Sequence, residues 1–211
     1  MNTFEVLEKL LRERILVFDG AMGTMIQGYN LDEAAFRGER FASHSSSLKG
    51  NNDILVLTQP HIIEEIHAKY LEAGADIIET NSFNANKISQ GDYGLESIVY
   101  DLNVAAAQVA KRAAQKYSTP EKPRLVAGAL GPTTKSLSIP LDVNNPGLRE
   151  LTFDQMVEVF YEQVRGLLDG GADILLPETA IDTLMMKAQL FAIQKYFDDN
   201  NVRVPVIATG G

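Results

Sequence analysis

Two stretches of this sequence repeat one phrase: residues 70–83 read YLEAGADIIETNSF, and residues 167–180 read LLDGGADILLPETA. In each stretch a helical pattern ends at a glycine, an Ala-Asp pair leads into a short apolar run, and the run closes on Glu-Thr. Short apolar runs bounded by glycine are typical of buried parallel strands. The repeat therefore predicts two equivalent helix–strand units, which carry Glu79 and Glu178 to the carboxyl ends of their strands.

The same alternation extends outward from the repeat in both directions. Together with the repeat itself, apolar runs predict five strands, at 15–20, 75–81, 124–131, 172–179 and 204–211. Helical spacing and capping residues predict five helices, at about 4–11, 60–74, 95–117, 152–169 and 182–197. The segment 21–58 is rich in Gly, Ser and Asn, and we expect it to be mostly loop, with a helical turn at 31–36.

Strands that alternate with helices imply an α/β fold with a parallel sheet and right-handed crossovers. A doubly wound open sheet and a (β/α)8 barrel of the TIM type both fit this pattern. The repeated phrase favours the barrel, because every βα unit of a barrel is equivalent. We therefore expect residues 1–211 to form one domain, an incomplete TIM barrel of about the first five βα units. Such an open sheet exposes two edges, through which copies of the chain could form a homo-oligomer.

Composition excludes several classes of partner. The 211 residues carry 19 Lys and Arg against 28 Asp and Glu, a formal net charge of −9. This balance disfavours nucleic acid and anionic membrane surfaces. No apolar run approaches the ~20 residues that span a bilayer, and residues 1–15 lack a signal-peptide core. Cysteine is absent, which excludes disulfides and thiolate ligands within the chain, and a cytoplasmic protein is the simplest interpretation.

Three acids fall at the expected carboxyl ends of strands: Asp19, Glu79 and Glu178. In a parallel sheet these ends meet on one side, where converging carboxylates suit an amino group or a hard metal ion. The glycine-rich turns DGAMGT at 19–24 and GALGPT at 128–133 would let backbone N–H groups approach a carboxylate or phosphate. Together the two features suit an amino-acid zwitterion. The alternative is that each acid simply caps the helix that follows it.

The three histidines, His44, His61 and His67, have no spacing typical of a metal site. His61 and His67 lie six residues apart, off a common helical face. We interpret them as surface or supporting residues.

Five stretches, in the same order along the chain, resemble the homocysteine-binding domain of cobalamin-dependent methionine synthase. They are VFDGAMGTMIQ (17–27), LKGNNDILVLTQP (48–60), GADIIETNSF (74–83), VAGALGPT (126–133) and GLLDGGADILLPET (166–179). The resemblance runs from about residue 16 to the end. It implies a (β/α)8 barrel that binds homocysteine through a zinc ion and transfers a methyl group to its sulfur from methylcobalamin, giving methionine.

The resemblance also implies site residues. Asp19 and Glu178 would bind the homocysteine amino group, and Gly20, Ala21 and Asn81 would lie beside them. The resemblance gives no such role to Glu79, the third acid at the carboxyl ends of the strands, and the role of Glu79 could be structural.

The family's zinc ligands are three cysteines, and this sequence has none and ends at its fifth expected strand. We therefore expect an N-terminal fragment of a methyltransferase that carries part of the substrate site, binds no zinc or cobalamin itself and is catalytically incomplete alone. The implied partners are homocysteine and the cobalamin- and folate-binding modules of the parent enzyme.

Two other interpretations stay open at this point. The chain could belong to a different TIM-barrel enzyme that uses Glu79 or Glu178 as a general base. It could also be a non-catalytic remnant whose exposed strand edges pair with another chain. Homocysteine binding and zinc content separate the first alternative from the methyltransferase, and light scattering tests the second.

Overall fold

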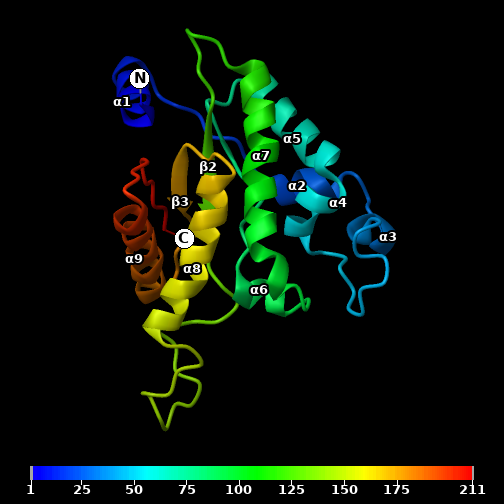
Figure 1. Cartoon of the computed structure of the whole chain (residues 1–211), viewed down its shortest axis with the longest axis vertical. Helices are drawn as coiled ribbons and strands as arrows, with labels where there is room; N and C mark the ends of the chain where they lie inside the picture. The colour runs from blue at the N-terminus through cyan, green and yellow to red at the C-terminus, as the bar shows by residue number, and fades with distance from the viewer. Residues whose placement is uncertain (1, 211) are drawn as a thin grey trace.

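The computed structural model describes residues 2–210, and Figure 1 shows four helices, α5, α7, α8 and α9, side by side across a short sheet. The described elements, in chain order, are α1 (Thr3–Glu13), α2 (Met22–Gln27), α3 (Glu33–Arg37), the 3-10 helix η1 (Asn52–Ile54), α4 (Leu55–Thr58), α5 (Pro60–Ala73), β1 (Ile77–Glu79), α6 (Lys87–Gly91), the 3-10 helix η2 (Glu96–Ile98), α7 (Val99–Tyr117), β2 (Leu125–Leu130), α8 (Phe153–Asp169), β3 (Ile174–Pro177) and α9 (Thr183–Asn200). Strand and helix alternate as an α/β fold requires. No helix within the described residues is both long and apolar enough to cross a lipid bilayer.

The sheet is parallel, with its three strands in the order β1-β2-β3. One segment on each side extends it by isolated parallel bridges: Phe18 pairs with Ile77, and Val206 pairs with Leu175. The expected strands at 15–20 and 204–211 are therefore wrong as strands over the described residues, which exclude residue 211, although both segments lie alongside the sheet. Within the described part of the chain each segment pairs with the sheet on one side, and Pro205 has no N–H to donate.

The two faces of the sheet are covered differently. Ile78 and Val126 point toward α5 and α7, and Leu175 packs with residues of α8 and α9. Their alternate neighbours point to the opposite face and form a second cluster, with Val6, Leu7, Leu16, Phe18 and Ile207 packed against Ile77, Leu125, Ala127, Ile174 and Leu176. Because side chains alternate along a strand, Glu79 and Glu178 belong to this second face.

The repeated phrase builds the same helix end twice. Gly74 ends α5 with a φ of +110°, and Gly171 follows α8 with a φ of +97°. These left-handed conformations cost glycine least, because it has no Cβ. The N–H groups of Gly74 and Ala75 donate to Leu71 O and Tyr70 O, and those of Gly171 and Ala172 donate to Leu168 O and Leu167 O. The glycine therefore turns each chain directly from helix into strand.

The aspartate of the phrase then fixes each new strand against the one before it. Asp76 donates its N–H to Val17 O and accepts the Val17 N–H on its carboxylate, at 2.7 and 3.0 Å. Asp173 makes the same pair of bonds with Val126, both at 2.9 Å. Basic side chains complete both sites, Arg14 on Asp76 and Lys111 on Asp173. The first half of the repeated phrase is thus a structural device at the amino ends of the strands.

The segment 21–58 is more ordered than its composition indicates. We expected mostly loop, but it contains α2, α3, η1 and α4, and only α3 matches the expected turn at 31–36. Buried apolar side chains fix these short elements, notably Ile26, Phe36, Leu48, Ile54 and Leu55, which pack against α5 and α7. Tertiary packing thus overrides the local preference of Gly, Ser and Asn for loops.

Several expected helix starts are confirmed. Thr152 and Gln155 form a reciprocal capping box at the start of α8, and the Asp182 side chain caps α9. Pro60 stands at the first turn of α5. Helix α6 was not expected, and Asn86 caps it.

Candidate functional site

A cavity of about 420 Å³ lies at the carboxyl ends of the strands. Carboxylates from Asp19, Asp53, Glu79 and Glu178 line it, and the described residues that line it include no Lys, Arg or His. We call it the acid cavity. Asp19 follows the bridge at Phe18, Glu79 ends β1, and Glu178 follows β3. The structure thus brings the three sequence-predicted acids together at one edge, where parallel strands deliver their ends.

Asp19 is the most enclosed of these three acids, with 3% of its side chain exposed. Its Oδ1 accepts the backbone N–H of Glu79 at 3.0 Å. Its own N–H donates to Ile77 O at 3.0 Å. The carboxylate is therefore fixed against β1, with its second oxygen, Oδ2, left for other contacts.

Glu178 reaches the same cavity through an unbroken strand register. Leu130 pairs with Pro177 at the end of the β2–β3 ladder, and the N–H of Glu178 donates to Leu130 O at 3.0 Å. No residue is inserted at Pro177, so Leu176 and Glu178 share a face by simple alternation. The proline lacks an N–H, but the bond from Glu178 closes the ladder behind it.

The clustered acids resist ionisation. Burial, with the negative charge of Glu79, raises the pKa of Asp19 to about 8 and the pKa of Glu178 to about 7. Burial also raises the pKa of Glu79, and that of Asp53 to about 6. No Lys or Arg among the described residues forms an ion pair with any of these carboxylates, and a cation in the cavity would supply a partner. The site is therefore suited to an ammonium group or another cation.

The other sequence-predicted residues lie around the acids. Gly20 and Ala21 line the acid cavity at the start of α2, and Asn81 lines it just after β1. The Asn81 amide donates to Asn52 O at 2.7 Å, which ties the end of β1 to the η1 turn. A Cβ at Gly20 would lie 3.5 Å from the Tyr70 hydroxyl, an ordinary contact.

Sequence reasoning missed two residues at this site. Asp53 is 5% exposed and accepts the N–H of Asn84 at 2.9 Å, and we had treated its segment as loop. Its position inside the matching stretch LKGNNDILVLTQP was the available signal. His67 is completely buried, with Nδ1 4.0 Å from Oδ2 of Asp19. It lies in the interior, so the expected surface position is wrong, and the expected supporting position stays a prediction.

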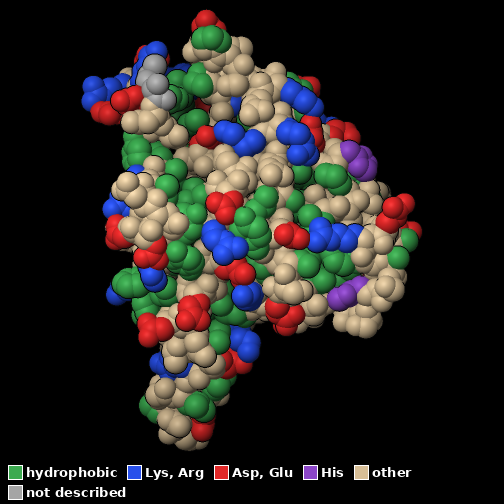
Figure 2. Space-filling view, viewed as in Figure 1, with side chains coloured by type: hydrophobic (Ala, Val, Ile, Leu, Met, Phe, Trp, Pro, Cys, Tyr) green, Lys and Arg blue, Asp and Glu red, His purple; other side chains and the backbone are tan. Residues whose placement is uncertain are grey.

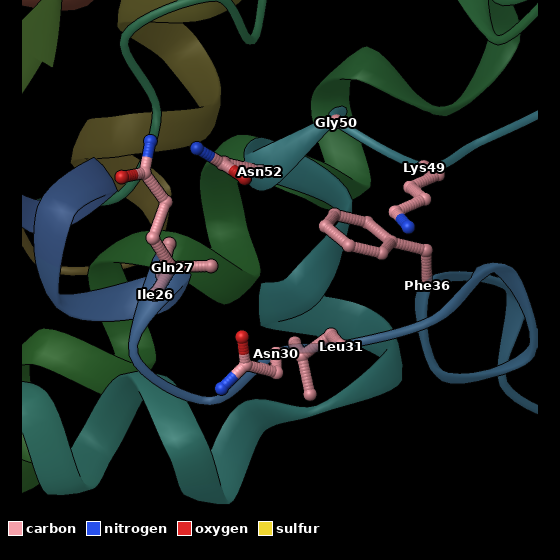
Figure 3. A pocket seen from close by; sticks show the side chains of 8 residues that line it. All are labelled: Ile26, Gln27, Asn30, Leu31, Phe36, Lys49, Gly50 and Asn52. Carbon is pink, nitrogen blue, oxygen red and sulfur yellow. The ribbon is translucent and has the colours of Figure 1, made fainter.

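A second cavity of about 520 Å³ adjoins the first and shares Asn52 with it (Figure 3). Its walls come from α2, α3 and the loop before η1, and its lining residues are Ile26, Gln27, Asn30, Leu31, Phe36, Lys49, Gly50 and Asn52. In Figure 3 the Lys49 side chain extends toward the side chain of Phe36. This cavity contains no acid, so the acid cavity is the candidate functional site.

Outside the cavities the charges are mixed. Figure 2 shows acidic and basic side chains interspersed over the face it presents. Most described ion pairs are surface pairs of this kind, such as Lys195 with Asp199 and Arg203 with Asp198. These contacts add little stability.

The residues present do not fit a zinc site. The sequence has no cysteine, and within residues 2–210 no group of three or more His, Cys, Asp or Glu side chains is arranged to hold a metal ion. The acids form the charged part of the cavity lining, without a histidine or thiolate among the described lining residues.

The family whose description reads homocysteine S-methyltransferase matches residues 16–210 of the chain. The match begins just before the segment that pairs with β1 and extends beyond α9. It therefore includes every residue that lines the acid cavity.

Two solved structures of the homocysteine methyltransferase MmuM from Escherichia coli are similar in fold. The oxidized form superposes with a TM-score of 0.70 at 23% identity, covering 95% of this chain and 63% of that one. The metallated form gives 0.68 at 21% identity, covering 97% and 65%. The chain thus spans less than two thirds of the length of either, and at this identity the likeness shows the fold.

Proposed function

Because the chain belongs to the homocysteine S-methyltransferase family, we propose that its acid cavity binds the amino group of L-homocysteine and directs the sulfur toward a methyl donor. The observation that carries this proposal is the meeting of four carboxylates in one cavity whose described lining includes no basic side chain. An α-ammonium group is the part of homocysteine that such a surface attracts.

We propose that Asp19 and Glu178 bind the ammonium group. Asp19 follows the segment that pairs with β1, and Glu178 follows β3, which pairs with β2. Each would accept a charge-assisted hydrogen bond, and such bonds are about twice as strong as neutral ones. Glu79 stands between them in the sheet and raises the pKa of both. A bound ammonium would offset that repulsion. Gly20, Ala21 and Asn81 would contact the remainder of the amino acid.

The wider context is also a proposal. The strands follow one another across the sheet without reversal, which a barrel requires and a doubly wound sheet does not. This order supports a TIM-type (β/α)8 barrel, of which residues 1–211 would be the N-terminal part. The matching motifs support a methionine synthase as parent, with methylcobalamin as donor and cobalamin- and folate-binding modules as partners. Since the described residues do not fit zinc, we expect the isolated chain to bind homocysteine without methylating it.

Of the two alternative interpretations, a general base at the rim is disfavoured by the family match, which specifies a different reaction class. Pairing through the sheet edges remains a proposal for homo-oligomer formation.

Isothermal calorimetry tests the proposed function. L-Homocysteine should bind the chain, and Asp19→Asn or Glu178→Gln should weaken binding at least tenfold, the loss of one charge-assisted hydrogen bond. The control is Glu158→Gln, which removes an exposed acid on α8 outside the cavity. Equal affinity in all four proteins would contradict the assignment.

A further inference from the structure

His67 is buried without a visible reason. It lies in α5, its side chain has no exposed surface, and neither ring nitrogen has a hydrogen-bond partner among the described residues. Buried polar atoms are nearly always paired, because leaving one unpaired forfeits its bonds to water. Two such atoms on one ring leave the imidazole of His67 available to a polar group close by.

The adjacent polar group is Asp19 of the acid cavity. Nδ1 of His67 lies 4.0 Å from Oδ2 of Asp19, beyond hydrogen-bond length but close enough for a small side-chain shift to close the gap. Oδ1 of Asp19 is already occupied by the N–H of Glu79. Oδ2 accepts no hydrogen bond from the described residues, so the unpaired acceptor and the unpaired nitrogen face each other.

We propose that His67 is a positioning residue of the acid cavity: its Nδ1–H turns to Oδ2 of Asp19 and holds that carboxylate in place when the carboxylate is ionised, as it would be beside a bound ammonium group. The identity of the ligand rests on the proposed function. The pairing of His67 with Asp19 does not, and it can be tested on the free protein.

The surrounding charges leave Asp19 as the partner. Glu64, on the same helix as His67, is already paired with Arg112 and Lys116 of α7. On the other side of Asp19 lie Glu79 and Glu178, both acids. Tyr70, also on α5, keeps its proton because burial and the charge of Asp19 raise its pKa.

The imidazole of His67 is neutral at neutral pH. Burial lowers the pKa of His67 to about 4, while burial and neighbouring acids raise that of Asp19 to about 8. Between these values both groups are uncharged. Above the higher value, or with a cation bound, a neutral ring faces a carboxylate, and only the tautomer with a proton on Nδ1 can donate to it.

The first test observes the ring directly. The chain has only three histidines, so the nitrogen-15 signals of the imidazoles can be assigned with the single variants His44→Gln and His61→Gln. We expect the His67 signals to change in one step with a midpoint near pH 8 and to show the Nδ1–H tautomer above it. In Asp19→Asn the step should disappear. Signals that stay constant from pH 6 to 10, or that change identically in Asp19→Asn, would overturn the proposal.

The second test uses L-homocysteine under reducing conditions. His67→Leu removes the donor and fills the space, and we expect it to bind about tenfold more weakly than the unmodified chain. His67→Asn places an amide donor near the position of Nδ1, and it should restore affinity to within about threefold. His61→Gln, at an exposed site on the same helix, is the matched control and should bind normally.

The two tests separate the possible failures. If His67→Leu and His67→Asn are weakened alike, or neither is, His67 only fills space and the proposal is wrong. If the unmodified chain binds no homocysteine, the proposed function fails, and the ring signals still decide whether His67 and Asp19 pair. The ring measurement uses the unmodified chain, Asp19→Asn and the two assignment variants His44→Gln and His61→Gln, so it holds even if His67→Leu does not fold.

Discussion

The backbone N–H of Glu79 donates to Oδ1 of Asp19 at 3.0 Å. This bond fixes two acids at the ends of adjacent parallel segments, in a cavity that Glu178 and Asp53 also enter. Holding these carboxylates together lowers the stability of the fold when they are ionised. Burial and the charge of Glu79 raise the pKa of Asp19 to about 8. Such a cluster is typical of a functional site rather than of a structural one.

The first prediction is that neutralising Asp19 stabilises the fold at alkaline pH. An unfolded aspartate ionises near pH 4, and Asp19 in the folded chain ionises near pH 8. The folded state binds more protons between these values, so the stability linked to Asp19 is complete below the unfolded pKa and is lost as pH rises through 8. Asp19→Asn should therefore raise the free energy of unfolding by roughly 1–3 kcal/mol at pH 8.5, and by much less at pH 4.

Urea denaturation at the two pH values measures this difference. Glu158→Gln is the control, and it should show no comparable dependence on pH. A variant Asp19→Asn that is less stable than the unmodified chain at pH 8.5 would contradict the electrostatic account.

The second prediction is that homocysteine binding releases protons. At neutral pH the raised pKa values keep Asp19 and Glu178 partly protonated, and an ammonium beside them favours the ionised form. Binding near pH 7.5 should release about one proton. Calorimetry in two buffers of different ionisation enthalpy measures the number, and identical apparent enthalpies would refute the prediction.

The third prediction concerns the repeated aspartates. Asp76→Ala should lower the free energy of unfolding by about 2 kcal/mol, because the Val17 N–H and the Arg14 guanidinium lose their buried acceptor. Glu8→Ala breaks the exposed pair with Arg12 and should cost less than about 0.5 kcal/mol. Chemical denaturation measures the free energy of unfolding of both variants. An equal decrease in the two would show that the bonds of Asp76 contribute no more to stability than an exposed ion pair does.

The fourth prediction tests the contact between α7 and α8. A Cβ at Gly170 would lie 2.6 Å from Val104 O and 2.7 Å from the Cβ of Ala107. Gly170→Ala should therefore push the helices apart and cost about 1–3 kcal/mol. At Gly147, in an exposed loop, a Cβ approaches nothing closer than 3.9 Å, so Gly147→Ala should be neutral. Equal thermal stability of both variants would argue against close packing at Gly170.

The sequence was sufficient for the central elements. Periodicity at α5, α7, α8 and α9 agrees with the structure, because each of these helices buries a continuous apolar face, and end signals also mark α5, α8 and α9. The grouping of Asp19, Glu79 and Glu178 was predictable as well, since parallel strands bring their carboxyl ends together.

Other features depend on contacts that are distant in sequence. The short helices between 21 and 58 are fixed by side chains such as Phe36 and Leu48 packing on α5 and α7, which local composition does not reveal. The outer segments pair with the sheet through isolated bridges, such as those at Phe18 and Val206, which an apolar run in the sequence does not distinguish from a full strand. His67 shares the buried face of α5 with Ile63 and Leu71, but its approach to Asp19, 48 residues away along the chain, cannot be inferred from α5 alone.

The central claim is that the acid cavity recognises the ammonium group of homocysteine. The most direct measurement compares the affinity of the chain for L-homocysteine with that for 4-mercaptobutyrate, which has the same thiol and carboxylate but no amino group. The account predicts that homocysteine binds at least tenfold more tightly, and that Glu178→Gln reduces this preference. Equal affinity for the two thiols, with no effect of Glu178→Gln, would contradict it.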